Sequence, residues 1–465
     1  MSRPYPDDPF LQGNFAPWPM EGEIRDLVVK GEVPRELCGS LYRNGPNPQF
    51  APRMPYHWFD GDGMIHAFHI EDGRVDYRNR WIRTERFQLE RTAGESLFGG
   101  LVNLTASDAR VQGLSGNAAN TNIVWHAGRL LALWEAGPPH QLDPETLETL
   151  GVFDFDGRLS GPMTAHPKLD PETGEMLMFG YGMLPPELVY TTVSAKGELV
   201  RSEPIQVPFP SMIHDFVTTR EHVIFPIFPA ALRPESLAQG ELVRWEPDLG
   251  THIGVMPRDG GNADVVWFQT DPCFVYHFLN AHTAGESVVV EAVRHPRVPF
   301  FSLGTDRAPG DLTHPALVRW SLNLGSGTLK QETLDEGPLE FPRLDERFAG
   351  LAYRHGFAAG RGREGVDGWF NAIVHHDLQK CERHTHELGP TSFTSEPVFV
   401  PRHADSAEGD GFLLCVVFRQ EENRSDLVIL DAGDLAGPPL AEVCLPHRIP
   451  YGFHGNWRPG PRRDP

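Results

Sequence analysis

The chain has 465 residues and a formal net charge of −22, from 41 Lys and Arg against 63 Asp and Glu. Hydrophobic residues make up 40% of it, which is enough to bury a large core and excludes a disordered protein. The acidic balance offers no cationic surface for a phosphate backbone, so a nucleic-acid partner is not expected. With 47 Gly and 43 Pro and no collagen period, the composition indicates many turns between short strands.

The N-terminal segment, residues 1–8, lacks the apolar stretch of a secretory signal, and no run reaches the 18 apolar residues that a membrane span requires. The cysteines are odd in number and form no C-x-x-C pair, which argues against a disulfide framework and a cysteine-built zinc site. They are Cys38, Cys273, Cys381, Cys415 and Cys444. We therefore expect a cytoplasmic protein.

Short β-rich runs separated by similar turns recur along the chain. Turns that suit tight hairpins, most of them with Asp or Asn together with Gly, occur at 71–75, 142–146, 169–174, 194–198, 247–250, 322–327 and 431–435. Six or seven units between the first and the last give about 50 to 60 residues per unit, the scale of a four-stranded propeller blade. This spacing favours a propeller without excluding other all-β folds. No composition shift marks a linker, so we expect one domain across residues 1–465.

Three segments rich in Pro and large apolar residues interrupt this pattern. Met183–Glu187, Phe225–Leu232 and Val298–Leu303 are predicted to be loops that cover a site rather than blade strands. The second and third could also form the mouth of a tunnel that touches a bilayer, so peripheral membrane contact is an expectation. Burial in the core is the alternative for both.

Four of the 21 histidines lie in apolar or aromatic segments, where an unpartnered imidazole costs free energy. They are His166, His214, His277 and His454. The gaps between them, 48, 63 and 177 residues, correspond to one, one and about three blades. Each histidine taken singly fits a hydrogen-bonded core residue, but histidines at blade spacing can converge on a propeller axis. The joint pattern favours a metal site.

With these histidines in view, the chain resembles the carotenoid cleavage oxygenases, a family that includes lignostilbene dioxygenases and retinoid isomerases. The resemblance runs from about Leu41 to Gly455. It is carried by five motifs in the family's order: Tyr42-Arg43-Asn44-Gly45-Pro46-Asn47-Pro48, Trp58-Phe59-Asp60-Gly61-Asp62-Gly63-Met64, Leu130-Leu131-Ala132-Leu133-Trp134-Glu135, Ser395-Glu396-Pro397-Val398-Phe399-Val400 and Gly452-Phe453-His454-Gly455.

The resemblance implies an all-β, seven-bladed β-propeller with a cap of loops and short helices over an axial metal site. It implies one Fe(2+) ion held by His166, His214, His277 and His454, with hydrogen bonds from ligand imidazoles to Glu135, Glu340 and Glu396. Carboxylates commonly fix the second N–H of a ligand imidazole in this way. It also implies that O2 cleaves a carbon–carbon double bond of a hydrophobic alkene into two carbonyl products without an organic cofactor.

Two positions of the sequence bear on the substrate. In the lignostilbene subgroup a lysine before the first glutamate and an earlier tyrosine hold a phenol oxygen; here the matching positions are Trp134 and roughly Leu101. We take both, with Phe59 and Phe278, as substrate-facing candidates, and expect a carotenoid or apocarotenoid. A stilbenoid or phenylpropene is the alternative, and a propeller that binds without catalysing is the other functional class.

Other constellations compete for a metal. His403-Ala404-Asp405 could belong to a facial triad, and His384-Thr385-His386 near His375-His376-Asp377 could bind Cu or Zn. A polar turn and a solvated hairpin are the simpler interpretations. The third ligand motif departs from the family in reading Asn280-Ala281-His282-Thr283, and we expect His282 to be a packing or tunnel residue rather than a ligand.

Overall fold

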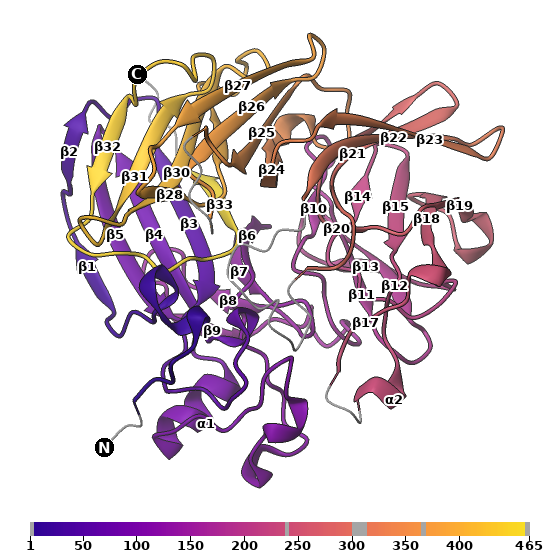
Figure 1. The fold of residues 1–465 in the computed structure, drawn as a ribbon, viewed down its shortest axis with the longest axis horizontal. Helices are drawn as coiled ribbons and strands as arrows, with labels where there is room; N and C mark the ends of the chain where they lie inside the picture. Colours follow the sequence, from indigo (N-terminus) through magenta and orange to yellow (C-terminus); the bar gives the residue numbers. More distant parts are fainter. Residues whose placement is uncertain (1–3, 238–240, 300–313, 364–368, 461–465) are drawn as a thin grey trace. The chain divides into compact units, whose positions relative to one another are not determined.

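The computed structural model describes residues 4–237, 241–299, 314–363 and 369–460, and strands account for most of its regular structure (Figure 1). Two compact units can be distinguished. The first comprises residues 1–153, 357–375 and 383–465, and the second comprises residues 154–356 and 376–382. The expectation of one domain across residues 1–465 stays a prediction.

The first unit contains three sheets. One has the order β1-β5-β4-β3-β33, another β2-β32-β31-β30-β28 with β29 also on β30, and the third β6-β7-β8-β9. Their strands are β1 (Gly22–Ile24), β2 (Val28–Gly31), β3 (Gly39–Pro46), β4 (Gly63–Glu71), β5 (Arg74–Trp81), β6 (Asn122–His126), β7 (Arg129–Leu133), β8 (His140–Leu142), β9 (Thr149–Val152), β28 (Ser392–Thr394), β29 (Val398–Pro401), β30 (Gly411–Arg419), β31 (Arg424–Asp431), β32 (Ala441–Cys444) and β33 (Gly455–Pro459).

The second unit contains the sheets β10-β11-β12-β13, β14-β15-β18-β19 and β20-β21-β22-β23, with a small pair β16-β17. Their strands are β10 (Lys168–Leu169), β11 (Met176–Tyr181), β12 (Leu188–Val193), β13 (Leu199–Ile205), β14 (Val217–Thr218), β15 (His222–Ile227), β16 (Ala230–Ala231), β17 (Arg244–Trp245), β18 (Thr251–Pro257), β19 (Val266–Thr270), β20 (Phe274–Ala284), β21 (Ser287–His295), β22 (Ala316–Asn323) and β23 (Thr328–Asp335).

A further four-stranded sheet has the order β24-β25-β26-β27, formed by β24 (Leu339–Leu344), β25 (His355–Gly360), β26 (Ala372–Asp377) and β27 (Glu382–Glu387). The described residues thus form seven sheets of four to six strands, the blades of a seven-bladed β-propeller, and the predicted fold class is confirmed. Helices are few: α1 (Glu85–Ala93), α2 (Pro234–Leu237) and short 3₁₀ turns such as η3 (Trp58–Asp60). That they cap the site stays a prediction.

The hairpin β4–β5 shows how the sequence builds a blade. Asp72 and Gly73, between the two strands, have φ of 50° and 76°, the left-handed pair that a tight hairpin turn requires. Along β5 every second residue is buried, from Val75 to Trp81, so one face packs in the core while the other meets solvent. The turn and the alternation were both readable from the sequence.

In the first unit, segments far apart in the chain share a sheet. β33 pairs with β3 in antiparallel register, from Gly39 opposite Pro459 to Arg43 opposite Gly455. This sheet therefore cannot be complete until the C-terminal strand has been made. The pairing also fixes the residue directly before β33, His454.

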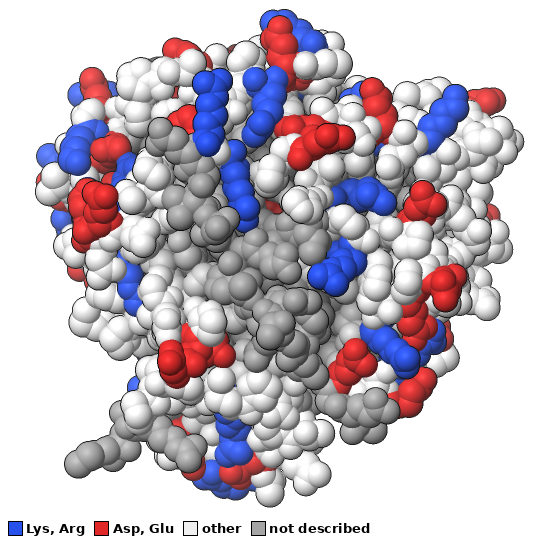
Figure 2. Space-filling model, in the orientation of Figure 1, with Lys and Arg blue, Asp and Glu red and all other residues white. Residues whose placement is uncertain are grey.

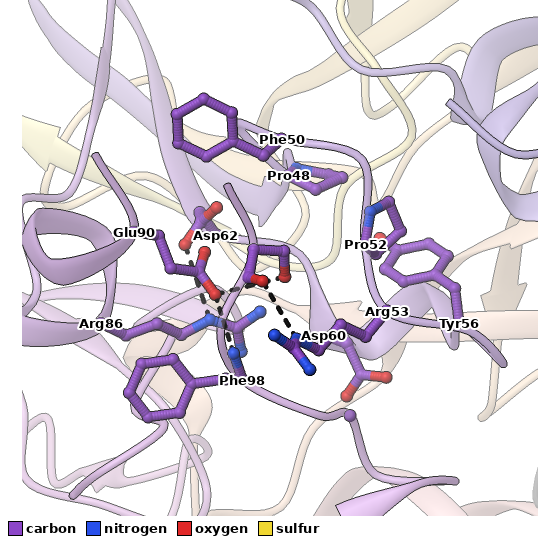
Figure 3. A pocket seen from close by; sticks show the side chains of 12 residues that line it. Pro48, Phe50, Pro52, Arg53, Tyr56, Asp60, Asp62, Arg86, Glu90 and Phe98 are labelled. Carbon is purple, nitrogen blue, oxygen red and sulfur yellow. Dashed lines mark hydrogen bonds and ion pairs between the residues drawn. The ribbon is translucent and has the colours of Figure 1, made fainter. Parts of the chain in front are cut away.

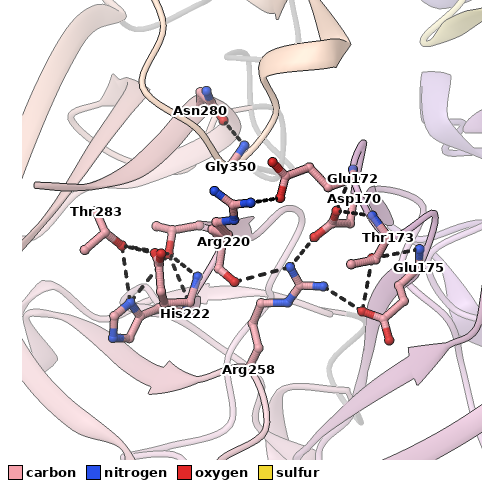
Figure 4. Close-up of polar contacts among 12 residues, drawn as sticks. Asp170, Glu172, Thr173, Glu175, Arg220, His222, Arg258, Asn280, Thr283 and Gly350 are labelled. Carbon is pink, nitrogen blue, oxygen red and sulfur yellow. Dashed lines mark hydrogen bonds and ion pairs between the residues drawn. The ribbon is translucent and has the colours of Figure 1, made fainter.

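In the second unit, polar side chains join neighbouring sheets (Figure 4). Arg258, directly after β18, forms ion pairs with Asp170 and Glu175, which flank the turn between β10 and β11. Thr283 of β20 donates to the carboxylate of Glu221 at 2.6 Å, beside β15. These contacts hold the β10, β14 and β20 sheets to one another near their hairpin turns.

The three Pro-rich segments differ in how far the structure bears out the prediction of loops. Met183–Glu187 is a loop between β11 and β12, as predicted, and whether it covers a site stays a prediction. The loop prediction for Phe225–Leu232 was wrong, and the alternative of burial in the core is confirmed: the segment contains the end of β15 and all of β16, and it is buried. In Val298–Leu303, residues 300–303 lie outside the described residues.

Acidic and basic side chains are interspersed on the face that Figure 2 displays. Across the described residues, many acidic and basic side chains form ion pairs with each other, such as Arg220 with Glu172. Within the described ranges, no helix has both the length and the apolar character needed to cross a membrane.

Candidate metal centre

The four candidate ligands occupy equivalent places in their sheets. His166 and His214 come just before β10 and β14, His277 lies within β20, and His454 directly precedes β33. Each of these strands is at the edge of its sheet. In a propeller the edge strand at one end of each blade lines the centre, so this placement is what a shared central site requires.

The imidazoles converge. One nitrogen from each of His166, His214, His277 and His454 lies within 4.8 Å of the others, and all four side chains are buried. The Nε2 atoms of His166 and His214 are 3.0 Å apart. Two nitrogens bound at right angles to one ion, each at about 2.1 Å, would be about 3.0 Å apart. The donor set therefore fits a bound metal ion, and that these four histidines are its ligands stays a prediction.

The competing constellations do not form comparable sites. Within the part of the chain that the structure describes, the four histidines are the one group of three or more His, Cys, Asp or Glu side chains with this geometry. His403-Ala404-Asp405 and the pair His384 and His386 are not part of such a group. His282, on β20, is also outside it, and its role as a packing or tunnel residue stays a prediction.

Glu340, on β24, holds one of the ligands. Its Oε2 accepts a hydrogen bond from His277 Nδ1 at 2.6 Å, and its Oε1 accepts one from His295 Nε2 at 2.8 Å. Burial alone would raise the pKa of Glu340, but the two imidazoles outweigh it and keep the pKa well below its usual value. Since Nδ1 of His277 donates to this carboxylate, Nε2 is the nitrogen that faces the other imidazoles.

Glu396, between β28 and β29, holds His454 in a similar way. Its Oε1 accepts from His454 Nδ1 at 3.0 Å, and its Oε2 accepts from the backbone N–H of Gly455 at 2.9 Å. The carboxylate thus fixes both the imidazole and the first residue of β33. For Glu340 and Glu396 the predicted partners are in place.

The third glutamate, Glu135, follows β7 and is partly buried. Its contact with a ligand imidazole stays a prediction. His295 was missed by the sequence analysis. It ends the apolar strand β21 without a recognisable motif, and only the fold shows that it shares the Glu340 carboxylate.

The substrate-facing candidates have varied surroundings. The Phe59 ring lies 5.3 Å from the ring of Phe453, the residue before His454. Leu101 donates its backbone N–H to Asp60 at 2.8 Å, and Trp134 is partly buried. Phe278 is buried in an apolar cluster, with its ring 6.4 Å from that of Trp320. Contact of these four residues with a substrate stays a prediction.

Comparison with known proteins agrees with the geometry. The sequence model of the family described as retinal pigment epithelial membrane protein matches residues 15–459. Isoeugenol monooxygenase of Pseudomonas nitroreducens is 39% identical, over 99% of this chain and 100% of that one. The crystal structure of Pseudomonas brassicacearum lignostilbene dioxygenase superposes with a TM-score of 0.93 at 36% identity, covering 99% of this chain and 100% of that chain.

A cobalt-substituted apocarotenoid oxygenase from Synechocystis superposes with a TM-score of 0.85 at 30% identity, covering 96% of this chain and 97% of that chain. That protein holds a metal ion, as the four-histidine group here predicts. The match over nearly the whole length, together with the metal centre, shows that the chain belongs to the carotenoid cleavage oxygenase family of alkene-cleaving dioxygenases.

Proposed function

We propose that the chain is a non-haem Fe(2+) dioxygenase that uses O2 to cleave one carbon–carbon double bond of a hydrophobic alkene into two carbonyl products. The observation that carries this proposal is the convergence of four buried imidazole nitrogens within 4.8 Å, two of whose rings are held by buried carboxylates. The site residues would be His166, His214, His277 and His454, supported by Glu135, Glu340 and Glu396.

The donor set favours iron over a structural zinc ion. Imidazole suits several transition metals, but structural zinc is usually four-coordinate and closed, and often uses thiolates. Four nitrogen ligands around an octahedral ion leave two positions open. When bound, ferrous iron would supply the binding and activation of O2 at those positions.

The protein's own groups prepare the site. Glu340 and Glu396 orient the rings of His277 and His454 and keep each Nδ1 proton in place. Their negative charges moderate the ion's positive charge without coordinating it. Because the four imidazoles are buried, water has little access to the site and competes little with the imidazole nitrogens for the ion.

For the substrate, an aryl alkene of the phenylpropene or stilbene type is supported by the relatives. The isoeugenol monooxygenase at 39% identity and the lignostilbene dioxygenase at 36% are both more similar to this chain than the Synechocystis apocarotenoid oxygenase at 30%. We therefore propose that the cleaved double bond is conjugated to an aromatic ring.

A carotenoid or apocarotenoid is the second candidate, because of two positions. Leu101 has no polar side-chain atom, and Trp134 offers only its indole N–H where the lignostilbene subgroup uses a lysine. A hydrocarbon polyene gains apolar contact from both residues, whereas a phenolate gains little. Turnover of isoeugenol, a hydroxystilbene and an apocarotenal under the same conditions separates the two candidates; preference for the apocarotenal would overturn the aryl alkene.

Metal analysis tests the function as a whole. Protein purified without chelators should hold about one iron per chain, and removal of iron should abolish turnover. A protein without metal would instead be a binding scaffold, and full-rate turnover by an iron-free preparation would contradict the proposal.

Cytoplasmic location and peripheral membrane contact stay predictions. Hydrophobic substrates partition into bilayers, so contact would ease their uptake. Phe225–Leu232 cannot provide it, because the segment is buried. Flotation of the protein with liposomes tests the expectation, and a protein that remains at the bottom of the gradient would contradict it.

A further inference from the structure

Asp215 follows the ligand His214 and contacts the segments of the other two ligands in its unit. Its side chain is only 2% exposed. Oδ1 lies 2.7 Å from Nζ of Lys168, two residues after His166, and Oδ2 accepts the backbone N–H of Phe278, the residue after His277, at 3.0 Å. One carboxylate therefore connects three ligand-bearing segments.

The contact to Phe278 occurs where β20 is irregular. The pairing of β20 with β21 shifts register between Val275 and Phe278 and again between Phe278 and Asn280. Such irregularities re-aim side chains and weaken the local ladder. The bond from the Phe278 N–H to Asp215 supplies a fixed point in this stretch, directly beside His277.

The carboxylate is well supplied with donors for a buried charge. Oδ1 also accepts the N–H of Phe216 at 2.8 Å, and the Lys168 ammonium lies 5.8 Å from the centre of the Phe216 ring. A buried charge is tolerated when it is paired and hydrogen-bonded, and removing one partner leaves the others uncompensated. Asp215 and Lys168 thus depend on each other.

We propose that Asp215, together with Lys168, is a positioning residue of the metal centre, which sets the spacing of His166, His214 and His277. The proposal rests on the proposed metal-dependent function. Asp215 does not itself bind the ion. It acts through backbone positions, so its loss changes the geometry of the three imidazoles rather than their number.

A second tie between sheets of the same unit provides a structural contrast. Arg258 joins the β18 strand to the turn between β10 and β11, but its partners Asp170 and Glu175 carry no ligand (Figure 4). If Asp215 only held the sheets together, removing either tie would have similar consequences for the metal. Arg258→Gln is therefore the matched control.

The experiment compares full-length wild type with Asp215→Asn, Lys168→Met and Arg258→Gln after loading with Co(II). Three properties are measured: the visible absorption of bound Co(II), the rate at which excess chelator removes it, and the melting temperature of the metal-free protein. Asp215→Asn should shift the absorption band and speed cobalt loss by about 10-fold or more. Lys168→Met should act in the same direction, less strongly.

Arg258→Gln should lower the melting temperature and leave the spectrum and the rate of cobalt loss unchanged. A wild-type spectrum and rate in both Asp215→Asn and Lys168→Met would overturn the proposal. If Asp215→Asn does not fold, Lys168→Met decides alone, since the Lys168 side chain is 25% exposed and its replacement is better tolerated. Failure of wild type to bind Co(II) or iron would instead refute the proposed function.

Discussion

Two buried carboxylates, Glu340 and Asp62, show how hydrogen-bond partners determine whether a buried carboxyl group is charged. Glu340 is 3% exposed and Asp62 is 2% exposed. Glu340 accepts two imidazole N–H groups at 2.6 and 2.8 Å, and its pKa is held low. Burial, with the nearby Glu90 adding to it, raises the pKa of Asp62 to about 6, and Arg86 only partly offsets this.

The difference lies in the hydrogen bonds. Asp62 Oδ2 accepts the N–H of Gln49 at 3.0 Å, but among the residues that the structure describes Oδ1 has no hydrogen-bond partner, and Arg86 Nε is 3.7 Å from it (Figure 3). Asp62 and Arg86 line a cavity of about 10 Å³, which has room for about one water molecule. Equal burial thus gives opposite pKa shifts: a fully bonded carboxylate stays charged and can orient a ligand, whereas Asp62 is poised to take up a proton.

The largest expected effect comes from removing the imidazole that Glu340 orients. His277→Ala should lower the metal content and reduce activity at least about 100-fold, because one of the four proposed ligands is lost. Metal analysis and turnover measure both. His282→Ala, on the same strand, is the control and should keep its metal. Unchanged metal content in His277→Ala would show that Glu340 does not orient a metal ligand, and the comparison of Glu340 with Asp62 would then fail.

Asp62→Asn tests the other carboxylate. Because the pKa of Asp62 is about 6 when folded against 3.8 ordinarily, the folded protein takes up a proton first as the pH falls. The free energy of unfolding of wild type should therefore rise relative to the variant from pH 6 to pH 4, by about 2 kcal/mol. Urea unfolding of both proteins between pH 7 and 4 measures the difference. A pH-independent difference would show that Asp62 is charged throughout.

Glu340→Gln should sharpen the contrast between the two sites. An amide can accept from only one of the two imidazoles, so His277 or His295 loses its partner. Metal affinity should fall about 10- to 100-fold, with little change in fold. Competition with a chromogenic chelator measures the affinity. Asp62→Asn is the matched control, and an equal loss in that variant would mean that the effect is not specific to the metal centre.

The smallest effect is expected from His295→Gln. Its side-chain amide can still donate to Glu340, while the carboxylate keeps its bond to His277. Metal affinity should fall less than about 10-fold, and the same chelator titration applies. A loss as large as that of Glu340→Gln would show that both imidazoles are needed to hold the carboxylate.

Much of the fold was predictable because its signals are local. The Asp72-Gly73 turn needs left-handed backbone, and the alternation along β5 follows from a half-buried strand. The loop prediction for Phe225–Leu232 was wrong because it relied on Pro226, and proline usually indicates a loop. β14 pairs only with Val223 and Ile224, so beyond them β15 is open on that side and tolerates a proline.

The metal centre was predictable for a different reason. Its four histidines recur at blade spacing and, with Glu340 and Glu396, lie in recognisable motifs. His295 and Asp215 could not be found in the same way, because their roles depend on contacts between strands. Asp215 stands beside a ligand, yet nothing in the segment around His214 tells that its partners are Lys168 and Phe278.

The place of His454, directly before β33, has a consequence for the order of events during synthesis. A ribosome that adds about 5 to 20 residues per second needs roughly 9 to 35 s to travel from His277 to His454. Throughout that interval the emerging polypeptide carries three of the four imidazoles and lacks the strand that pairs with β3. A site with all four imidazole nitrogens can therefore form only after this last segment has been translated.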